Sequence, residues 1–553
     1  MVAYAAIIWI YFVLPLEGRF GQAMLGTAVF PYDAILNAGI LEWGRKALGS
    51  ASLHLFDWTA GFPLPNTLAN TENLLGWQPG FAVLRWAGLS VAFSYNTLFI
   101  AAFFVSAIGV RLLARRFGAS EEGAFLSGLI FAFVPFHVVH AIHLQTLAIC
   151  WVPFAIYFLD RYLAGGKVID LAGMAVSIAL CFLSGVYIGF FLAIALPAYV
   201  LIAAATHRIT LQRKRLLALA GAAIGLAVAL WPIISHYVAY SKANGYAHPA
   251  DVLTRFSIEL LALVKVPSWQ ALWVGTGYPG VTARESAAFP GFVAVALVGA
   301  AFWTAREPSS RATTRLLIVM ALFFFAFSLG PRLMFQENTP VPLAKWILLP
   351  GRIFEWFSVV RWPMRALLFS LVFLAVMAGL GFTAITRDAS PRRRAVDCAL
   401  VALLLFFEYR PIDWYGRESV TVPDPLAVSD AYPFLAKESD RGAIVDLPAA
   451  DEGGYRTPML VRSTYGSAGH LRRVVATHGQ ALPPLTITII EEAERLPAPS
   501  AVIQLRSYGC SRVVFHRKWA PGETLENTVE ALRAAGLPVL WESEESVIFS
   551  LSP

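Results

Sequence analysis

The sequence has few charged residues. Asp, Glu, Lys and Arg make up 14% of its 553 residues, whereas hydrophobic residues make up 57%. A soluble domain carries about 25% charged residues, so this composition excludes an ordinary soluble enzyme. It predicts a polytopic α-helical membrane protein instead.

Cysteine is scarce, and the common nucleotide and hydrolase motifs are missing. The four cysteines are scattered, so the sequence shows neither a disulfide framework nor the spacing of a zinc site. It contains no Walker loop, no G-x-G-x-x-G, no H-E-x-x-H and no G-x-S-x-G. ATP-driven transport, a nucleotide cofactor and the standard hydrolase mechanisms therefore have no support in the sequence.

Long apolar segments recur along the first 409 residues. A membrane-spanning helix needs about 20 apolar residues. We predict about eleven transmembrane helices, and we divide the long apolar stretch 171–205 in two near Gly185. The approximate spans are 2–16, 94–113, 123–139, 145–160, 169–186, 188–205, 216–233, 289–305, 315–330, 364–386 and 395–409.

Cationic residues predict how these spans are oriented. Clusters of Arg and Lys follow every second span, and all of them fall on one side of the membrane if the spans alternate. Such an excess is typical of cytoplasmic loops. We therefore expect a cytoplasmic N-terminus in a bacterial inner membrane, with the loops 17–93, 234–288 and 331–363 outside. The net charge of +7 is concentrated in this part of the chain and indicates topology, not nucleic-acid binding.

The last 144 residues contain no further span and carry a net charge of −4. Their pattern alternates between strand and helix, so we predict two domains: a transmembrane domain, 1–409, which includes the first outer loop, and a periplasmic α/β domain, 410–553. The expected elements of the second domain are strands at 443–447 and 511–516, helices at 501–508 and 523–535, and a hairpin at 538–551.

The interiors of the predicted spans contain almost no charge. Asp160, Arg161 and Glu408 stand at span ends. Ion-coupled transporters usually carry acids near the middle of the membrane, so this scarcity weighs against transport.

Acidic residues gather instead in the first outer loop. Asp33 follows the first span by about 17 residues and is a candidate general base for an attacking hydroxyl. The alternative is that Asp33 caps a helix covering 34–48. His54, Asp57 and Glu72 are candidates for a second acid, a metal ligand or a substrate contact, and the alternative for them is a solvated loop with turns.

Three histidines recur every three residues at the outer end of the third span. On a helix, His137, His140 and His143 would cover an arc of roughly 120°. A metal site would need further ligands from elsewhere in the chain. Contact with a substrate or its phosphate, and packing at the membrane interface, are the other two interpretations.

Two further outer loops carry candidate substrate contacts. Arg361 and Arg365 run against the cationic bias of the inner side, and arginine forks suit phosphate oxygens. The alternative is an anchor to lipid head groups. The loop 269–291 is rich in aromatic residues and glycine and contains Tyr278 and Glu285, which suits a sugar but is common in outer loops generally.

Short segments throughout the chain resemble a bacterial branch of the GT-C superfamily, the integral membrane glycosyltransferases that use polyprenyl-phosphate-linked sugars. Members have a long first outer loop with an essential acid, many spans and often an outer C-terminal domain. Many also carry an acidic pair where this chain has Tyr32 and Asp33, so the use of a divalent metal stays open. The similar segments are 32–37 with Trp43, 62–69 with Glu72, 95–96, 143–145 with 151–153, 184–187, 361–365 and 505–516.

The resemblance implies an inverting glycosyltransferase of the cell envelope. Its donor would be a polyprenyl-phosphate sugar in the membrane, and its acceptor an extracytoplasmic glycan, lipid or protein. Asp33 would deprotonate the acceptor, while Arg361, Arg365 and His143 would hold the donor phosphate. Two other interpretations remain: a flippase or polysaccharide transporter for lipid-linked sugars, and a non-catalytic factor in envelope assembly.

Overall fold

The computed structural model describes the whole chain except residues 28–30, 245–249, 268, 274–279, 282–286, 306, 337–338, 341–360, 412–417, 441, 451–455, 480–481, 520–522 and 553. The described chain divides into two compact units. The first unit consists of Met1–Glu17, Thr97–Trp231 and Tyr246–Glu418. The second unit consists of Gly18–Asn96, Pro232–Gly245 and Ser419–Pro553.

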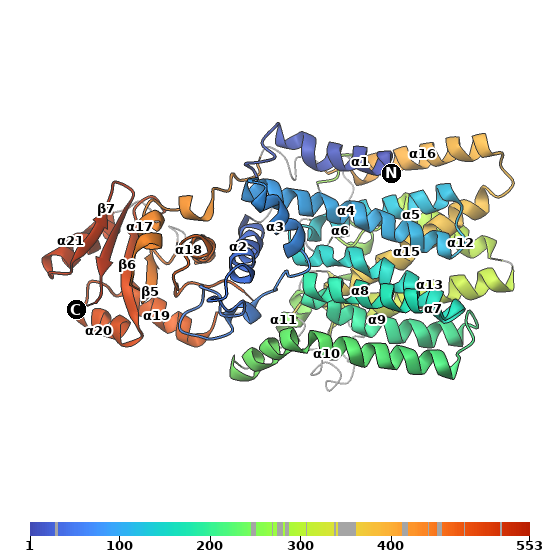
Figure 1. Ribbon diagram of the computed structural model, residues 1–553. Coiled ribbons are helices and arrows are strands. Elements are labelled where there is room, and N and C mark those ends of the chain that lie inside the picture. The colour runs from blue at the N-terminus through green and yellow to red at the C-terminus, as the bar shows by residue number, and fades with distance from the viewer. Residues whose placement is uncertain are drawn as a thin grey trace. The chain divides into compact units, whose positions relative to one another are not determined.

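The first unit is built mainly from apolar helices (Figure 1). Six helical segments of the described residues are long and apolar enough to cross a membrane: α4 (Val91–Arg116), η4 with α7 (Leu144–Gly165), α9 (Val186–Ala205), α10 (Arg213–Asn244), Ser310–Ser328 within α13, and η8 with α15 (Pro363–Ile385). Shorter apolar segments are Val2–Leu16, which includes α1, α8 (Val168–Ser184) and α12 (Phe292–Thr304). These helices are those of a multi-pass membrane protein, and the count of eleven spans stays a prediction.

Two breaks shape the helices of the first unit. Gly185 has extended backbone angles between α8 and α9, which confirms the predicted division of the stretch 171–205. The third expected span is not one helix, because α5 (Glu121–Phe133) ends before Pro135 and a separate short helix, α6 (Pro135–His140), follows. Proline lacks the N–H that a continuous helix needs, so a break at this position is expected.

Helix α15 (Leu367–Ile385) lies at the centre of the first unit and packs against α5, α12 and α13 (Pro308–Ser328). Small residues allow the close approach: a Cβ on Gly379 would collide with the backbone of Gly123, and one on Gly381 with Leu297. Such residues are typical of helix contacts inside membranes.

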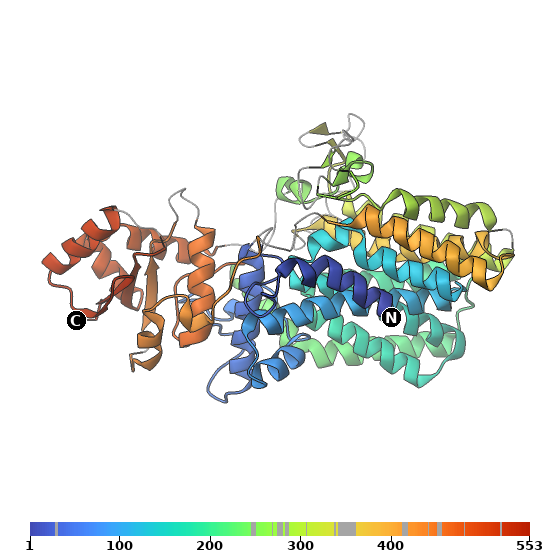
Figure 2. The ribbon, with the colours of Figure 1, turned by 90° about the horizontal axis from the view of Figure 1, so that it is seen from above.

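The N-terminal helical segment lies beside α16 (Pro391–Tyr409) in both views (Figures 1 and 2). The hydroxyl of Tyr11 donates to the backbone carbonyl of Phe406 at 2.6 Å, and the two rings lie 5.3 Å apart. The short first segment is thus attached to the helix that precedes the C-terminal part of the chain.

The second unit contains a four-stranded sheet in the order β5–β6–β8–β7. Strands β5 (Ala443–Leu447) and β6 (Cys510–His516) are parallel, and β8 (Ser546–Ser550) pairs antiparallel with β6 and with β7 (Val539–Glu542). The predicted strands and the hairpin are therefore confirmed. The predicted helices correspond to α20 (Pro499–Ser507) and α21 (Glu523–Ala534).

Three helices of this unit were not expected from the sequence: α17 (Tyr432–Lys437), α18 (Thr457–His470) and α19 (Pro484–Glu494). In α18, glycine, serine and threonine replace the usual strong helix formers. The helix forms because it packs along α2 (Pro31–Leu48) of the first loop, and its residues are almost all buried.

The first loop extends the sheet of the C-terminal part. The N–H of Val475 donates to the carbonyl of Ile444 in β5, and the N–H of Val474 donates to the carbonyl of Thr59 at 2.7 Å. On the same side, the N–H of Gly61 donates to the carbonyl of Ala476 at 3.0 Å. Residues 474–476 therefore connect the first loop with the sheet, and the two segments form one body. The boundary near residue 410 stays a prediction.

Candidate functional site

Asp33 lies in the first turn of α2 in the second unit. The helix begins at Pro31, two residues before Asp33, so the carboxylate does not stand at the position of a cap that precedes the helix. An acidic residue in a first turn is favoured by the helix dipole by about 0.3–1 kcal/mol. The side chain of Asp33 is 21% exposed, which leaves it accessible to a substrate hydroxyl.

His478 is the residue that sequence reasoning missed. Its Nε2 lies 3.6 Å from Oδ1 of Asp33, and its side chain is 24% exposed. The histidine stands two positions after the 474–476 segment that links the first loop to β5. No local sequence signal marks it, because its role depends on a pairing between segments far apart in the chain.

The other first-loop candidates have different surroundings. Glu72 is 6% exposed, whereas His54 and Asp57 are exposed. The carboxylate of Asp57 accepts the backbone N–H of Asn66 at 2.9 Å, which stabilises a turn of the loop. Asp57 thus stabilises a turn of the loop, and the substrate contacts expected of Asp57, His54 and Glu72 stay predictions.

The end of α10 packs on the first loop. Its His236 ring stacks on Phe56 with centroids 4.1 Å apart and bonds Oδ1 of Asn66 through Nδ1 at 2.6 Å. Tyr237 receives a hydrogen bond from Nδ2 of Asn73 at 3.2 Å and donates to the carbonyl of Thr71. These contacts hold the loop on both sides of Glu72.

An arginine and aromatic cluster is the main feature of the outer-loop candidates in the first unit. The guanidinium of Arg365 lies 4.9 Å from the ring centre of Trp362 and 5.8 Å from that of Tyr187. The guanidinium of Arg361 lies 5.8 Å from the same Trp362 ring and 5.1 Å from the ring of Phe256. The two arginines, four positions apart, thus converge on one indole.

Burial distinguishes the two arginines. Arg365 is 4% exposed, in the short helix η8 (Pro363–Ala366), and Arg361 is half-buried. A charge held against aromatic rings and away from water interacts strongly with any anion that reaches it. The cluster therefore has the chemistry of a phosphate-binding site.

The histidines do not share one helical face as expected. His140 is the last residue of α6, and His143 lies beyond it in extended backbone geometry. His137 and His140 are buried, and each bonds a backbone carbonyl through Nδ1 at 2.9 Å. His143 instead approaches the arginine cluster, with its ring 6.3 Å from that of Trp362. Of the three, His143 alone is placed beside this cluster within the described residues.

Tyr278 and Glu285 lie outside the described residues. Within the described part of the chain, no group of three or more His, Cys, Asp or Glu side chains is arranged to hold a metal ion. Asp33 and His478 are two possible ligands among the described residues, and Mg²⁺ is often held by one or two carboxylates together with water and phosphate. The use of a divalent metal stays open.

The structure is similar to solved membrane glycosyltransferases along its whole length. The structure of ArnT from Cupriavidus metallidurans matches with a TM-score of 0.51 and 13% identity, over 100% of this chain and 97% of that one. The arabinofuranosyltransferase AftD from Mycobacteria matches with a TM-score of 0.60 and 15% identity, over 100% of this chain and 41% of AftD. The chain has the GT-C fold.

A third GT-C structure, the archaeal oligosaccharyltransferase AglB from Archaeoglobus fulgidus, matches with a TM-score of 0.50 and 13% identity over 95% of this chain and 71% of AglB. AglB was solved with an inhibitory peptide and a dolichol-phosphate, and ArnT also with undecaprenyl phosphate. No protein-family model matches the sequence, and no curated protein matches it. The similarity therefore lies in the GT-C fold.

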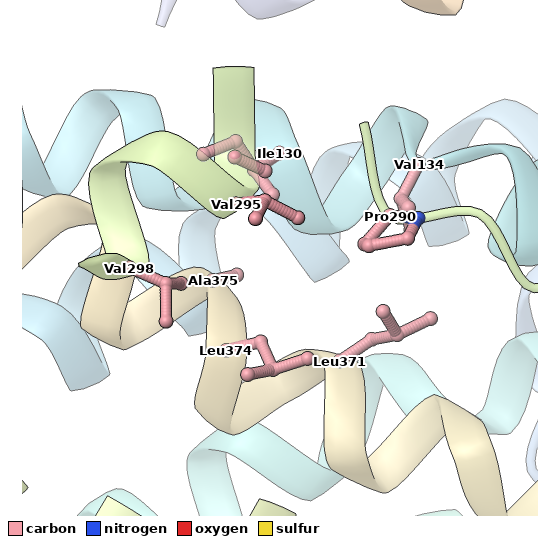
Figure 3. Close-up of a pocket in the computed structure, with 9 residues that line it drawn as sticks. Ile130, Val134, Pro290, Val295, Val298, Leu371, Leu374 and Ala375 are labelled. Carbon is pink, nitrogen blue, oxygen red and sulfur yellow. The ribbon is translucent and has the colours of Figure 1, made fainter. Parts of the chain in front are cut away.

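Within the GT-C helices, a small apolar cavity of about 70 Å³ lies between α5, α12 and α15 (Figure 3). Figure 3 shows the side chains of Ile130, Val295 and Leu371 among those that line it. The cavity is too small and too apolar for a sugar. It suits a short stretch of hydrocarbon.

Proposed function

We propose that the chain is a membrane glycosyltransferase that transfers a sugar from a polyprenyl-phosphate donor to an acceptor hydroxyl outside the cytoplasm. The observation that carries the proposal is the GT-C fold over the full chain. The acid at the start of the first-loop helix and the arginine cluster support it, because they are the two kinds of group that this reaction needs.

In the proposed reaction, the acceptor oxygen attacks the anomeric carbon of the donor sugar. The new carbon–oxygen bond forms as the bond to the phosphate oxygen breaks, and the polyprenyl phosphate leaves with the electron pair. Asp33 takes the proton of the acceptor hydroxyl. A single displacement of this kind inverts the configuration of the anomeric carbon.

Arg361 and Arg365 would bind the phosphate of the donor and stabilise the charge that develops on the leaving group. Their convergence on Trp362 supports this role, since packed rings hold both guanidinium groups in place before the donor arrives. His143 would contribute a further contact, since its ring lies 6.3 Å from that of Trp362.

His478 would orient the carboxylate of Asp33. The distance of 3.6 Å between Nε2 and Oδ1 is slightly longer than a hydrogen bond and can shorten when substrate binds. A histidine at this position would hold the carboxylate in one orientation toward the acceptor hydroxyl.

The transporter interpretation is less well supported, because the charges at the span ends already have structural partners. Asp160 in α7 (Val152–Gly165) is 1% exposed, lies 2.6 Å from Nε of Arg116 and accepts from the hydroxyl of Tyr199 at 2.6 Å. Glu408 accepts the backbone N–H groups of Phe292 and Val293 at the start of α12. These charges stabilise helix packing and helix ends, which weighs against a role in carrying ions.

The test is to incubate the purified full-length protein with a panel of polyprenyl-phosphate sugars and a mixture of envelope glycans and lipids. Mass spectrometry then records loss of the donor and gain of one sugar mass on an acceptor. Transfer from one donor supports the proposal. Movement of the donor across the membrane of a vesicle without any sugar transfer would identify a flippase. If neither transfer nor movement is observed, the non-catalytic assembly factor is the interpretation that remains.

A further inference from the structure

The second unit contains a cavity of about 790 Å³ at the C-terminal end of α2, far from Asp33. Its volume is that of a typical small-ligand site, about 300–1,000 Å³. The residues that matter for its chemistry are Arg45, Lys46, Arg472, Arg473, Trp86 and Ser52. Four cations thus line the cavity, and none of the described residues that line it is a carboxylate.

Two of these cations already serve the fold. Arg472 is buried, forms ion pairs with Glu438 and Asp440 and donates to the carbonyl of Gly442 at 3.0 Å. Lys46 donates to the carbonyls of Ala468 and Gly469, at 2.7 and 2.9 Å, and so satisfies the last turn of α18. These two residues make the wall of the cavity rigid, and the charge of Arg472 is compensated by its two carboxylate partners.

The other two cations keep donors for a ligand. Arg45 bonds Glu42 through Nε and Nη2, and its Nη1 makes no hydrogen bond within the described residues. Arg473 donates through Nη2 to the carbonyl of Leu64 at 3.0 Å and lies over the ring of Phe62 at 4.9 Å. Its Nε and Nη1 have no partner in the described part of the chain, so both arginines can bind an anion.

Burial weakens the charged forms of two of these cations. It lowers the pKa of Lys46 and the pKa of Arg473, because their cationic forms lose contact with water. An anion that binds between them would restore much of the lost stabilisation.

An exposed tryptophan completes the cavity. Trp86 is the last residue of α3 (Gln78–Trp86), and 71% of it is exposed. An exposed indole ring can stack on the apolar face of a sugar ring. The hydroxyls of the half-buried Ser50 and the exposed Ser52 line the same cavity, 3.0 Å from each other. An aromatic face, hydroxyl groups and free guanidinium donors together suit a sugar ring that carries a negative charge.

We propose that this cavity binds an acidic carbohydrate and that this carbohydrate is the acceptor, a step that rests on the proposed transferase function. Asp33 and Arg45 lie twelve positions apart on α2, which corresponds to about 18 Å at 1.5 Å per residue. The cavity therefore does not belong to the reacting centre. It holds an extended acceptor at a point several sugar units away from the hydroxyl that reacts.

Binding can be measured without any donor. Calorimetric titration of the purified full-length protein in detergent would use tetragalacturonate as the acidic probe and maltotetraose as the neutral probe with the same number of rings. We expect the acidic probe to bind, the neutral probe to bind at least tenfold more weakly, and added salt to weaken the acidic probe only. Equal binding of the two probes, or no binding of the acidic one, overturns the proposal.

Variants locate the site. Trp86→Ala and Arg473→Ala should each weaken the acidic probe about tenfold, whereas Arg495→Ala, which removes a mostly exposed arginine of the same unit, should leave it unchanged. Since Arg473 also bonds the first loop, Ser52→Asp provides a milder variant at an exposed position, and its added carboxylate should weaken the probe to a similar degree. Wild-type affinity in Trp86→Ala and Ser52→Asp would refute the site.

Two comparisons distinguish the carbohydrate site from a membrane anchor and from the proposed transferase function. If Trp86→Ala lowers binding to vesicles of anionic lipid but not to tetragalacturonate, the residue anchors the unit to a membrane and the proposal is wrong. Because the titration contains no donor, a failure of sugar transfer does not affect it. If the acidic probe binds but no sugar is transferred to such a carbohydrate, the acceptor role is refuted and the carbohydrate-binding site is retained.

Discussion

The carboxylate of Asp33 and the imidazole of His478 face each other, with Oδ1 and Nε2 3.6 Å apart. One residue belongs to the first loop and the other to the C-terminal part of the chain, yet both lie in a single compact unit. The C-terminal part therefore contributes to the surroundings of the proposed base and is more than an appended domain.

The role of His478 predicts a coupled effect on transfer. His478→Ala should lower the rate of sugar transfer about tenfold, because the carboxylate loses the group that orients it. His478→Gln, which keeps a donor nitrogen, should recover most of the rate. In an Asp33→Asn background, His478→Ala should cost nothing further. Fully additive losses in this double-mutant cycle would show that the two residues act independently.

The arginine cluster predicts how donor binding responds to conservative changes. Arg361→Lys and Arg365→Lys retain the charge but lose the fork that grips two phosphate oxygens. Each should weaken labelled donor about tenfold in detergent without anionic lipid, and the alanine variants should weaken it more. Lipid attraction depends on charge alone, at about 1 kcal/mol per residue. Wild-type donor affinity in both lysine variants would therefore favour a lipid anchor.

The buried Glu42 predicts a stability effect that vanishes in acid. Burial alone would raise the pKa of Glu42, but the hydrogen bond from Arg45 and the charges of Arg85 and Arg45 outweigh it and lower this pKa. The ionised carboxylate thus stabilises the fold above the unfolded-state pKa, and this stability is lost as the pH falls through the folded-state pKa.

Glu42→Gln should lower the unfolding free energy at pH 7 by about 1–3 kcal/mol, and the difference from wild type should disappear in acid below the folded-state pKa. Thermal unfolding at neutral and acidic pH measures this. Glu491→Gln, at an exposed site of the same unit, serves as the control. Equal melting temperatures of Glu42→Gln and wild type at pH 7 would contradict the assignment.

His470 predicts a second pH effect. Its burial lowers its pKa to about 3, and its Nδ1 accepts the backbone N–H of Arg472 at 3.1 Å, so the ring is neutral in the fold. The unfolded chain takes up this proton at about pH 6.5. Stability is therefore lost as the pH falls from about 6.5 towards 3, by up to about 1.4 kcal/mol per pH unit.

His470→Gln keeps an acceptor and removes the titrating group. Its unfolding free energy should fall less than that of the wild type between pH 7 and pH 5, in a denaturant titration at each pH. His54→Gln changes an exposed histidine of the same unit and should leave the slope unchanged. The same slope in His470→Gln and wild type would show that His470 does not titrate as described.

Local patterns predicted much of the fold. Strand β5 could be predicted from its five buried positions. The strands and helices after residue 500 could be predicted in the same way, because their hydrophobic period is visible in short stretches of sequence. The turn at Gly185 was predicted because one apolar stretch was too long for a single span. The position of Asp33 was found from the polar break after the first span, although the helix around it begins earlier than expected.

Long-range pairing could not be predicted. The hydrogen bonds that join Thr59 and Gly61 to residues 474–476 link short extended segments with no alternating pattern of their own. His478 and the cavity beside Arg45 both depend on that pairing and were therefore missed. The expected single helical face for the three histidines was wrong for a local reason: α6 ends at His140, so His143 lies beyond the helix and does not share a face with His137 and His140. The substrate contacts expected of His140 and His143 stay predictions.

The central claim is that Asp33 is the base in sugar transfer. Asp33→Asn keeps the shape of the side chain, and an Asn in the first turn supports the helix nearly as well. The direct measurement is the rate of transfer from the polyprenyl-phosphate donor by purified Asp33→Asn, compared with wild type at equal donor occupancy and equal melting temperature. We predict a loss of about 10²-fold or more with unchanged donor affinity. Near-normal turnover by Asp33→Asn would contradict the account.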